Sequence, residues 1–161
     1  MQTSLLPAKI KTFIIALISL SGLFFGSFRP IMGEQEWISW GNRFLNENYD
    51  PTVEPTLKKY EINLTPDHFM RLRKTYQQGK QEYYSFSLKQ FSDLGYIAGS
   101  AATDTLEMKT QADDIIYQTY QDPQGDIDSM ATHWDIPVKK LSPQRLDSLK
   151  QAFDFLKGKG L

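Results

Sequence analysis

The pattern of hydrophobic and polar positions divides the chain into an apolar N-terminal segment and a longer region of mixed character. Residues 12–28 read TFIIALISLSGLFFGSF and carry no charge. As a helix this segment spans roughly 25 Å, close to the ~30 Å thickness of a bilayer's hydrocarbon core. A surface helix of a soluble protein shows a polar face and this segment shows none, so a buried soluble helix is the weaker alternative. We expect these membrane-embedded side chains: Phe13, Ile14, Ile15, Leu17, Ile18, Leu20, Leu23, Phe24 and Phe25.

The charges around this segment predict its orientation. Lys9 and Lys11 precede it, while only Arg29 follows before the acidic Glu34 and Glu36. Positive charge stays on the cytoplasmic side, so the N-terminus is expected in the cytoplasm and the rest of the chain outside. We therefore divide the chain into a membrane segment, residues 1–33, and a single small extracytoplasmic domain, residues 34–161.

Two kinds of membrane segment fit this pattern. A cleaved signal peptide would place its cut after Ile31-Met32-Gly33, but signal peptidases favour small residues and the −3 residue here is Ile. An uncleaved signal-anchor needs no such site and is favoured by the long apolar run. A secreted or periplasmic domain, released by cleavage, stays open as the alternative.

Residues 35–47 have the periodicity of a short amphipathic helix. Trp37, Trp40, Phe44 and Leu45 recur at helical spacing directly after the membrane segment. The two tryptophans suit either an interfacial position at the lipid headgroups or the core of the domain, and the sequence leaves both open. Residues 48–55 contain two prolines and are expected to form a loop.

Two further helices are predicted. The one over residues 65–79 begins at Thr65-Pro66, a capping residue followed by a proline that suits the first turn, and its apolar face is Phe69, Leu72 and Tyr76 before a terminating Gly79. The helix over residues 143–157 has the same design, with Ser142, Pro143, an apolar face of Leu146, Leu149, Phe153 and Leu156, and Gly158 at its end.

The region between these helices favours strands. Residues 82–89 and 105–109 alternate apolar with polar side chains, and residues 115–120 are rich in β-branched and aromatic types. Asp122-Pro123-Gln124-Gly125 has the composition of a hairpin turn, after which residues 126–135 resume. Residues 112–120 and 127–134 also fit a helical face, so the alternative is an all-α bundle. We predict an α+β fold: an N-terminal membrane helix, short helices, a small antiparallel β-meander and a C-terminal amphipathic helix.

Composition narrows the possible functions. From Glu34 onward the chain has 15 basic and 19 acidic residues, which gives no electrostatic reason to bind nucleic acid. Because there is no cysteine, disulfides, thiolate metal sites and cysteine nucleophiles are excluded.

No motif predicts catalysis or a cofactor. His68 and His133 each lack a second ligand at metal-binding spacing. Asp122, Asp126 and Asp128 surround the predicted turn and are weak candidates for a metal site, but their spacing differs from an EF-hand loop and suits turn-forming Asp. A set of aromatic residues could line a groove for a ligand or partner, but core packing is the favoured interpretation. The set is Tyr83, Tyr84, Phe86, Phe91, Tyr96, Tyr117 and Tyr120.

The functional expectation follows from the membrane segment and the lack of site chemistry. We expect a membrane-tethered, non-enzymatic accessory or scaffold subunit of a cell-envelope assembly. Its partners would be the membrane and one or more envelope proteins. The alternative is an exported soluble domain that binds a ligand or catalyses a reaction.

Overall fold

The structure is a computed structural model of the chain, and it describes residues 32–99 and 102–159. The membrane segment predicted at residues 12–28 therefore lies outside the described residues. Within those ranges no helix has both the length and the apolar character needed to cross a bilayer. The elements are, in order, α2 (Glu34–Asn48), η1 (Pro51–Val53), β1 (Leu57–Leu64), β2 (Phe69–Tyr76), β3 (Gln81–Ser87), η2 (Leu88–Gln90), β4 (Phe91–Ile97), β5 (Thr103–Thr110), β6 (Ile115–Tyr120), β7 (Asp128–Ala131), β8 (His133–Lys139) and α3 (Pro143–Lys157).

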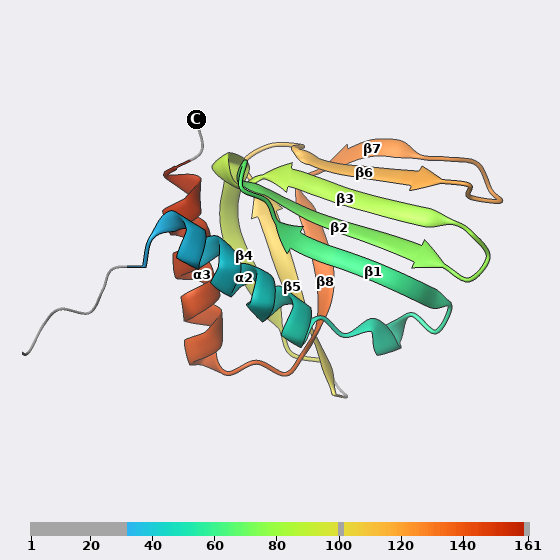
Figure 1. Cartoon of the computed structure of the whole chain (residues 1–161). Helices are drawn as coiled ribbons and strands as arrows, with labels where there is room; N and C mark the ends of the chain where they lie inside the picture. Colours follow the sequence, from blue (N-terminus) through green and yellow to red (C-terminus); the bar gives the residue numbers. More distant parts are fainter. Residues whose placement is uncertain (1–31, 100–101, 160–161) are drawn as a thin grey trace, which may run out of the picture. The chain divides into compact units, whose positions relative to one another are not determined.

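Two antiparallel sheets contain the largest share of the regular structure in the described residues. One has the strand order β1-β2-β3-β6-β7 and the other β4-β5-β8. Figure 1 shows the strands of the two sheets crossing steeply, with β3 passing into β4 through η2 and β7 into β8 through Thr132. Strands that turn such corners are typical of orthogonally packed sheets. The inner faces meet where Trp134 of β8 stacks on Tyr84 of β3, with ring centroids 5.0 Å apart.

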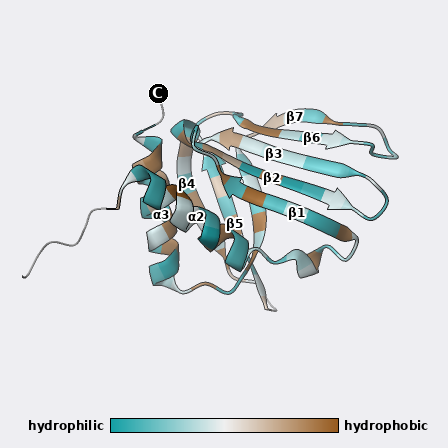
Figure 2. Cartoon of the chain, in the orientation of Figure 1, coloured by the Kyte–Doolittle hydropathy of each residue, from teal (hydrophilic) through white to brown (hydrophobic). Residues whose placement is uncertain are grey.

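The core follows from alternation along the strands and one face of each helix. On β5 every second residue is buried, including Leu106 and Met108. Along β1 the alternation is confined to the C-terminal half, where Ile62 and Leu64 are buried and Glu61 and Asn63 are exposed; Figure 2 shows hydrophilic and hydrophobic bands on this strand. From α3, Phe153 meets Phe91 edge-on at 5.2 Å between ring centroids, which joins this helix to the three-stranded sheet. The helices predicted at residues 35–47 and 143–157 are confirmed as α2 and α3, and α3 has the predicted bounds.

The helix predicted over residues 65–79 is wrong, because β2 occupies most of it. Thr65 and Pro66 begin a turn, in which His68 adopts φ 60° and its N–H donates to the Thr65 carbonyl at 3.0 Å. Gly79, at φ 93°, lies in the β2–β3 hairpin turn rather than at a helix end. The buried side of β2 includes Lys74 and its outer side includes Phe69. The apolar residues therefore do not alternate regularly along the sequence, and the hydrophobic pattern did not reveal a strand.

The predicted small meander is also wrong, and so is the all-α alternative. The strands expected between residues 82 and 135 exist but belong to two sheets, which together contain eight strands among the described residues. β1 and β4 were not predicted. Both carry a register shift, between Leu57 and Lys59 and between Phe91 and Asp93, and such irregularities break the period of two that identifies a strand.

Candidate functional site

The inner face of the five-stranded sheet changes from apolar to charged along its strands. On β2 the inward residues Met70 and Leu72 are followed by Lys74 and then Tyr76. β3 runs antiparallel and places Glu82 opposite Lys74. The end of the sheet near the β2–β3 hairpin is therefore polar inside, which is unusual because charged side chains are seldom buried unless they are paired.

The buried Lys74 is paired with two carboxylates, those of Glu54 and Glu82. Only 9% of the Lys74 side chain is exposed, and its Nζ lies 2.6 Å from Glu54 Oε1 and 3.9 Å from Glu82 Oε2. The Tyr76 hydroxyl donates to Glu54 and lies 2.9 Å from Glu82 Oε2, so it links the two carboxylates. Tyr49 adds a hydrogen bond to Glu54 at 3.2 Å.

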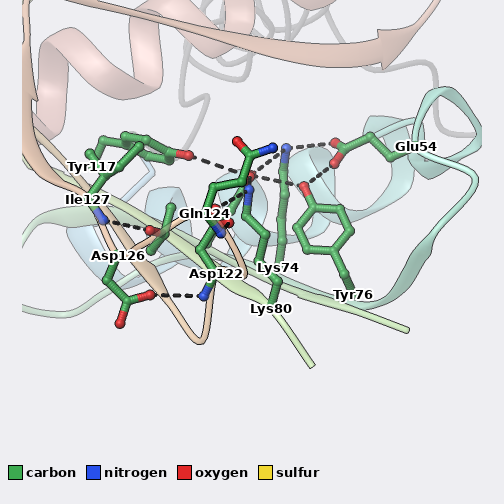
Figure 3. Close-up of polar contacts among 11 residues, drawn as sticks. Glu54, Lys74, Tyr76, Lys80, Tyr117, Asp122, Gln124, Asp126 and Ile127 are labelled. Carbon is green, nitrogen blue, oxygen red and sulfur yellow. Dashed lines mark hydrogen bonds and ion pairs between the residues drawn. The ribbon is translucent and has the colours of Figure 1, made fainter. Parts of the chain in front are cut away.

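A second lysine extends this network to the next hairpin. Lys80 Nζ lies 3.1 Å from Glu82 and 2.9 Å from Asp122, which belongs to the turn between β6 and β7 (Figure 3). Asp122 also accepts the N–H of Gln124 at 3.0 Å. We call the set of Glu54, Lys74, Tyr76, Lys80, Glu82 and Asp122 the ionic cluster. It fixes the β6–β7 turn to the β2–β3 hairpin.

The pKa shifts of four cluster members, Glu54, Tyr76, Lys80 and Asp122, hold each of them in one charge state near neutral pH. Burial opposes ionisation of Glu54, but hydrogen bonds from Lys74 and Tyr76 bring the pKa of Glu54 below its ordinary value. The hydrogen bond to Asp122 raises the pKa of Lys80, and the same contact lowers the pKa of Asp122. Burial and two carboxylate partners raise the pKa of Tyr76. General acid–base catalysis favours groups that titrate near the working pH, so these four groups suit a structural role.

The turn held by the ionic cluster belongs to an acidic hairpin, residues 111–132. This segment contains five aspartates and neither lysine, arginine nor histidine. Several of its apolar side chains are exposed: 58% of Met130 and 47% each of Ile127 and Tyr120. Beside the turn lies a shallow hollow of about 180 Å³, lined by Gln118, Thr119, Tyr120, Asp126, Ile127 and Asp128.

The edge strand β1 is closed by α2. Asn42 on α2 accepts the N–H of Leu64 at 2.7 Å and donates to the carbonyl of the same residue at 2.9 Å. Asn46, one turn further along α2, donates to the Ile62 carbonyl at 2.9 Å. These two amides thus take the place of a neighbouring strand along this edge.

Both edges of the three-stranded sheet are contacted by other elements along part of their length. At β8, Tyr49 forms a β-bridge with Val138, and the N–H of Asp50 donates to the Pro137 carbonyl at 3.0 Å. At β4, Lys157 of α3 donates to the Phe91 carbonyl at 2.6 Å.

The fourth edge, β7, differs. It pairs with β6 on one side, and within residues 32–99 and 102–159 no hydrogen bond joins its other side to another element. Figure 1 shows β7 as the outermost strand of its sheet, at the edge opposite β1 and α2.

The predicted metal candidates do not converge. Asp122 pairs with Lys80, and Asp126 accepts the N–H of Asp122 at 2.9 Å. Asp128 lies on β7 and is exposed. In the described part of the chain, no group of three or more His, Asp or Glu is arranged to hold a metal.

The other candidate residues are dispersed. His68 lies in the turn before β2, 3.0 Å from Glu34, while His133 begins β8 and is exposed. Trp37 and Trp40 are partly buried, pack against the core and meet edge-on with ring centroids 5.8 Å apart.

Sequence reasoning missed the ionic cluster, except for Asp122. Its members come from five separate elements or turns. The one available signal is spacing: Lys74 and Tyr76 lie two and four residues after Leu72, so in a strand all three share one face.

Comparison with known proteins adds no identity. No protein-family model, curated protein or solved structure matches the chain.

Proposed function

We propose that the protein is a membrane-tethered, non-enzymatic accessory subunit of a cell-envelope assembly, and that the acidic hairpin is its contact surface for a protein partner. The observation that carries the proposal is the open edge of β7. An exposed edge strand is a template for pairing with another chain, and natural proteins usually cover or blunt such edges. Here other elements form hydrogen bonds at the β1, β4 and β8 edges, whereas within residues 32–99 and 102–159 none does so at the outer edge of β7, which displays Met130.

The ionic cluster supports the same proposal. It fixes the position of the acidic hairpin through Lys80 and Asp122, so the edge is presented in one arrangement. A surface that is ordered before binding loses less conformational entropy when the partner arrives. The lowered pKa of Glu54 and the raised pKa of Lys80 also suit this mechanical role better than proton transfer near neutral pH.

Tethering makes a modest interface sufficient. A domain held at the membrane meets a membrane partner at a raised effective concentration, so a short edge can contribute to a stable assembly. The apolar, uncharged residues 12–28 and the lysines before them support this placement.

The tether is tested by intact-mass measurement of the native protein after extraction from membranes. The proposal predicts a mass that includes residues 1–33 and release only by detergent. A soluble form that begins near Glu34 would instead favour the exported-domain alternative.

The contact surface is tested by co-purification with a pair of charge-reversal variants. Asp126→Lys/Asp128→Lys changes the acidic hairpin, and Asp147→Lys/Asp154→Lys makes the same charge change on exposed positions of α3. The proposal predicts that a partner recovered with the wild-type protein is lost from the first variant and kept by the second. Equal recovery from both variants would contradict it.

A further inference from the structure

The backbone of β7 presents hydrogen-bonding groups in a fixed pattern. Ile127 faces β6, because its carbonyl accepts the N–H of Thr119 at 2.9 Å and its N–H donates to the Thr119 hydroxyl at 2.7 Å. In an antiparallel strand successive residues direct their N–H and C=O groups to opposite sides. Asp128 and Met130 therefore direct theirs away from the sheet.

The charge around this edge is of one sign. Asp128 is the first residue of β7 and Asp126 lies two residues before it. Asp113 and Asp114 precede β6, whose first residue pairs with the last residue of β7. Within the described ranges none of these four carboxylates takes part in an ion pair, whereas Asp122 forms one with Lys80. A second copy of β7 would bring further aspartates to the same edge, so like charges disfavour self-pairing.

The outer face of β7 carries one apolar side chain, Met130, between Asp128 at one end of the strand and Asp113 and Asp114 near the other. Met130 lies opposite Ile116 on the outer face, and Asp128 lies opposite Gln118 in the next pair along the same face. A strand beside β7 would meet a carboxylate and then a methionine at alternate positions. Cross-strand neighbours of opposite charge and apolar neighbours each stabilise a sheet.

We infer that β7 accepts an extended segment of a partner protein, one that carries Lys or Arg opposite Asp128 and, two residues away on the same face, an apolar residue opposite Met130, as a sixth strand of the five-stranded sheet. This inference rests on the proposed function and names the chemistry of the partner. Main-chain hydrogen bonds supply affinity in such strand addition, while alternate side chains supply specificity. Only two residues of β7 offer outward groups, so binding of an isolated peptide is weak, with a Kd on the order of 0.1–1 mM.

The test uses the full chain in neutral lipid nanodiscs and peptides of about eight residues. In one peptide every second residue is lysine and valine in turn, with threonine between them, and the control has glutamate in place of each lysine. Chemical shifts and hydrogen exchange of the backbone amides are measured by NMR. We expect the lysine peptide to slow exchange of the Asp128 and Met130 amides about fivefold. We expect the glutamate peptide to bind about tenfold more weakly or worse.

A pair of variants separates the backbone from the side chain at the edge. Met130→Pro removes an outward N–H, and proline is tolerated at strand edges. Met130→Thr keeps the N–H and introduces a β-branched side chain, which suits a strand. The inference predicts loss of peptide binding in the first variant and retention within about threefold in the second. The wild-type exchange measurement remains decisive if Met130→Pro fails to fold.

Three outcomes would overturn the inference. These are equal binding of the two peptides, protection that appears away from β7, and protection that appears with protein concentration alone, which would assign the edge to a second copy. If a partner depends on the acidic hairpin in membranes while neither peptide protects β7, the proposed function stands and strand addition fails.

Discussion

Replacing Lys74 by methionine tests whether the ionic cluster stabilises the fold. Methionine keeps the length and apolar character of the stem, so the change chiefly removes the ammonium group. At 2.6 Å from Glu54 and 3.9 Å from Glu82, in a side chain with 9% exposure, the lost attraction is substantial. Breaking a buried pair by removing one partner costs about 3–5 kcal/mol, because the other charge stays buried.

We expect a value near the lower limit, about 3 kcal/mol, because other donors remain. Tyr76 and Tyr49 still bind Glu54, and Lys80 still forms an ion pair with Glu82. That cost is a large part of a typical total stability of about 5–15 kcal/mol.

The matched control is Lys59→Met. Lys59 is paired with Glu61, but their side chains are 66% and 51% exposed, so this loss should be below about 1 kcal/mol. Urea unfolding of the full chain in neutral detergent, followed by circular dichroism and tryptophan fluorescence, measures both variants. The reasoning is refuted if the two free energies of unfolding fall by the same amount.

Three other changes test parts of the fold. Asn42→Leu leaves the N–H and carbonyl of Leu64 without their side-chain partners and should cost about 2 kcal/mol in urea unfolding; Asn42→Asp, which keeps an acceptor for the N–H, should cost less. Gly41→Ala would place its Cβ 2.5 Å from Leu64 Cδ1 in the core, so a loss of about 1–3 kcal/mol is expected, and an unchanged unfolding midpoint would contradict the close approach. The pKa of Glu54 is lowered in the folded state, so its contribution to stability is present above the unfolded value of 4.5 and is lost as pH falls through the folded pKa; Glu54→Gln should flatten the fall in stability below about pH 5, and an unchanged slope would argue against the shift.

The helices were predictable because their signals are local. For α3, Ser142 caps the first turn by accepting the N–H of Arg145, Pro143 occupies the first position, and the apolar face is continuous. All of these features lie within one short stretch of sequence. The Asp122–Gly125 turn was found for the same reason, and its hydrogen bond from Gly125 N–H to the Asp122 carbonyl is 2.9 Å long.

The sheets were harder to predict because their signals depend on distant neighbours. Lys74 occupies an inward position on β2, and only Glu54 and Glu82 make that burial possible. Nothing near Lys74 in sequence identifies Glu54 as a partner. The contrast between the two edges of the five-stranded sheet is equally hidden from the sequence. It requires the strand order and the contact of Asn42 with Leu64 at the β1 edge, and both depend on residues far apart in the chain.

The same signals also serve more than one structure. A threonine followed by proline starts helices and turns alike, and a glycine at positive φ ends a helix or completes a hairpin. At residues 65–79 both ends of the predicted helix proved to be turns.

The central claim is that a partner contacts the protein along β7, and site-specific photo-crosslinking in native membranes tests it most directly. A photoreactive residue at Met130, which is 58% exposed, is compared with one at Ile97, which is 54% exposed on β4. We expect a discrete crosslinked product from position 130 that disappears in Asp126→Lys/Asp128→Lys, and none from position 97. Equal products from both positions, or a product at 130 that survives the charge reversal, would contradict the account.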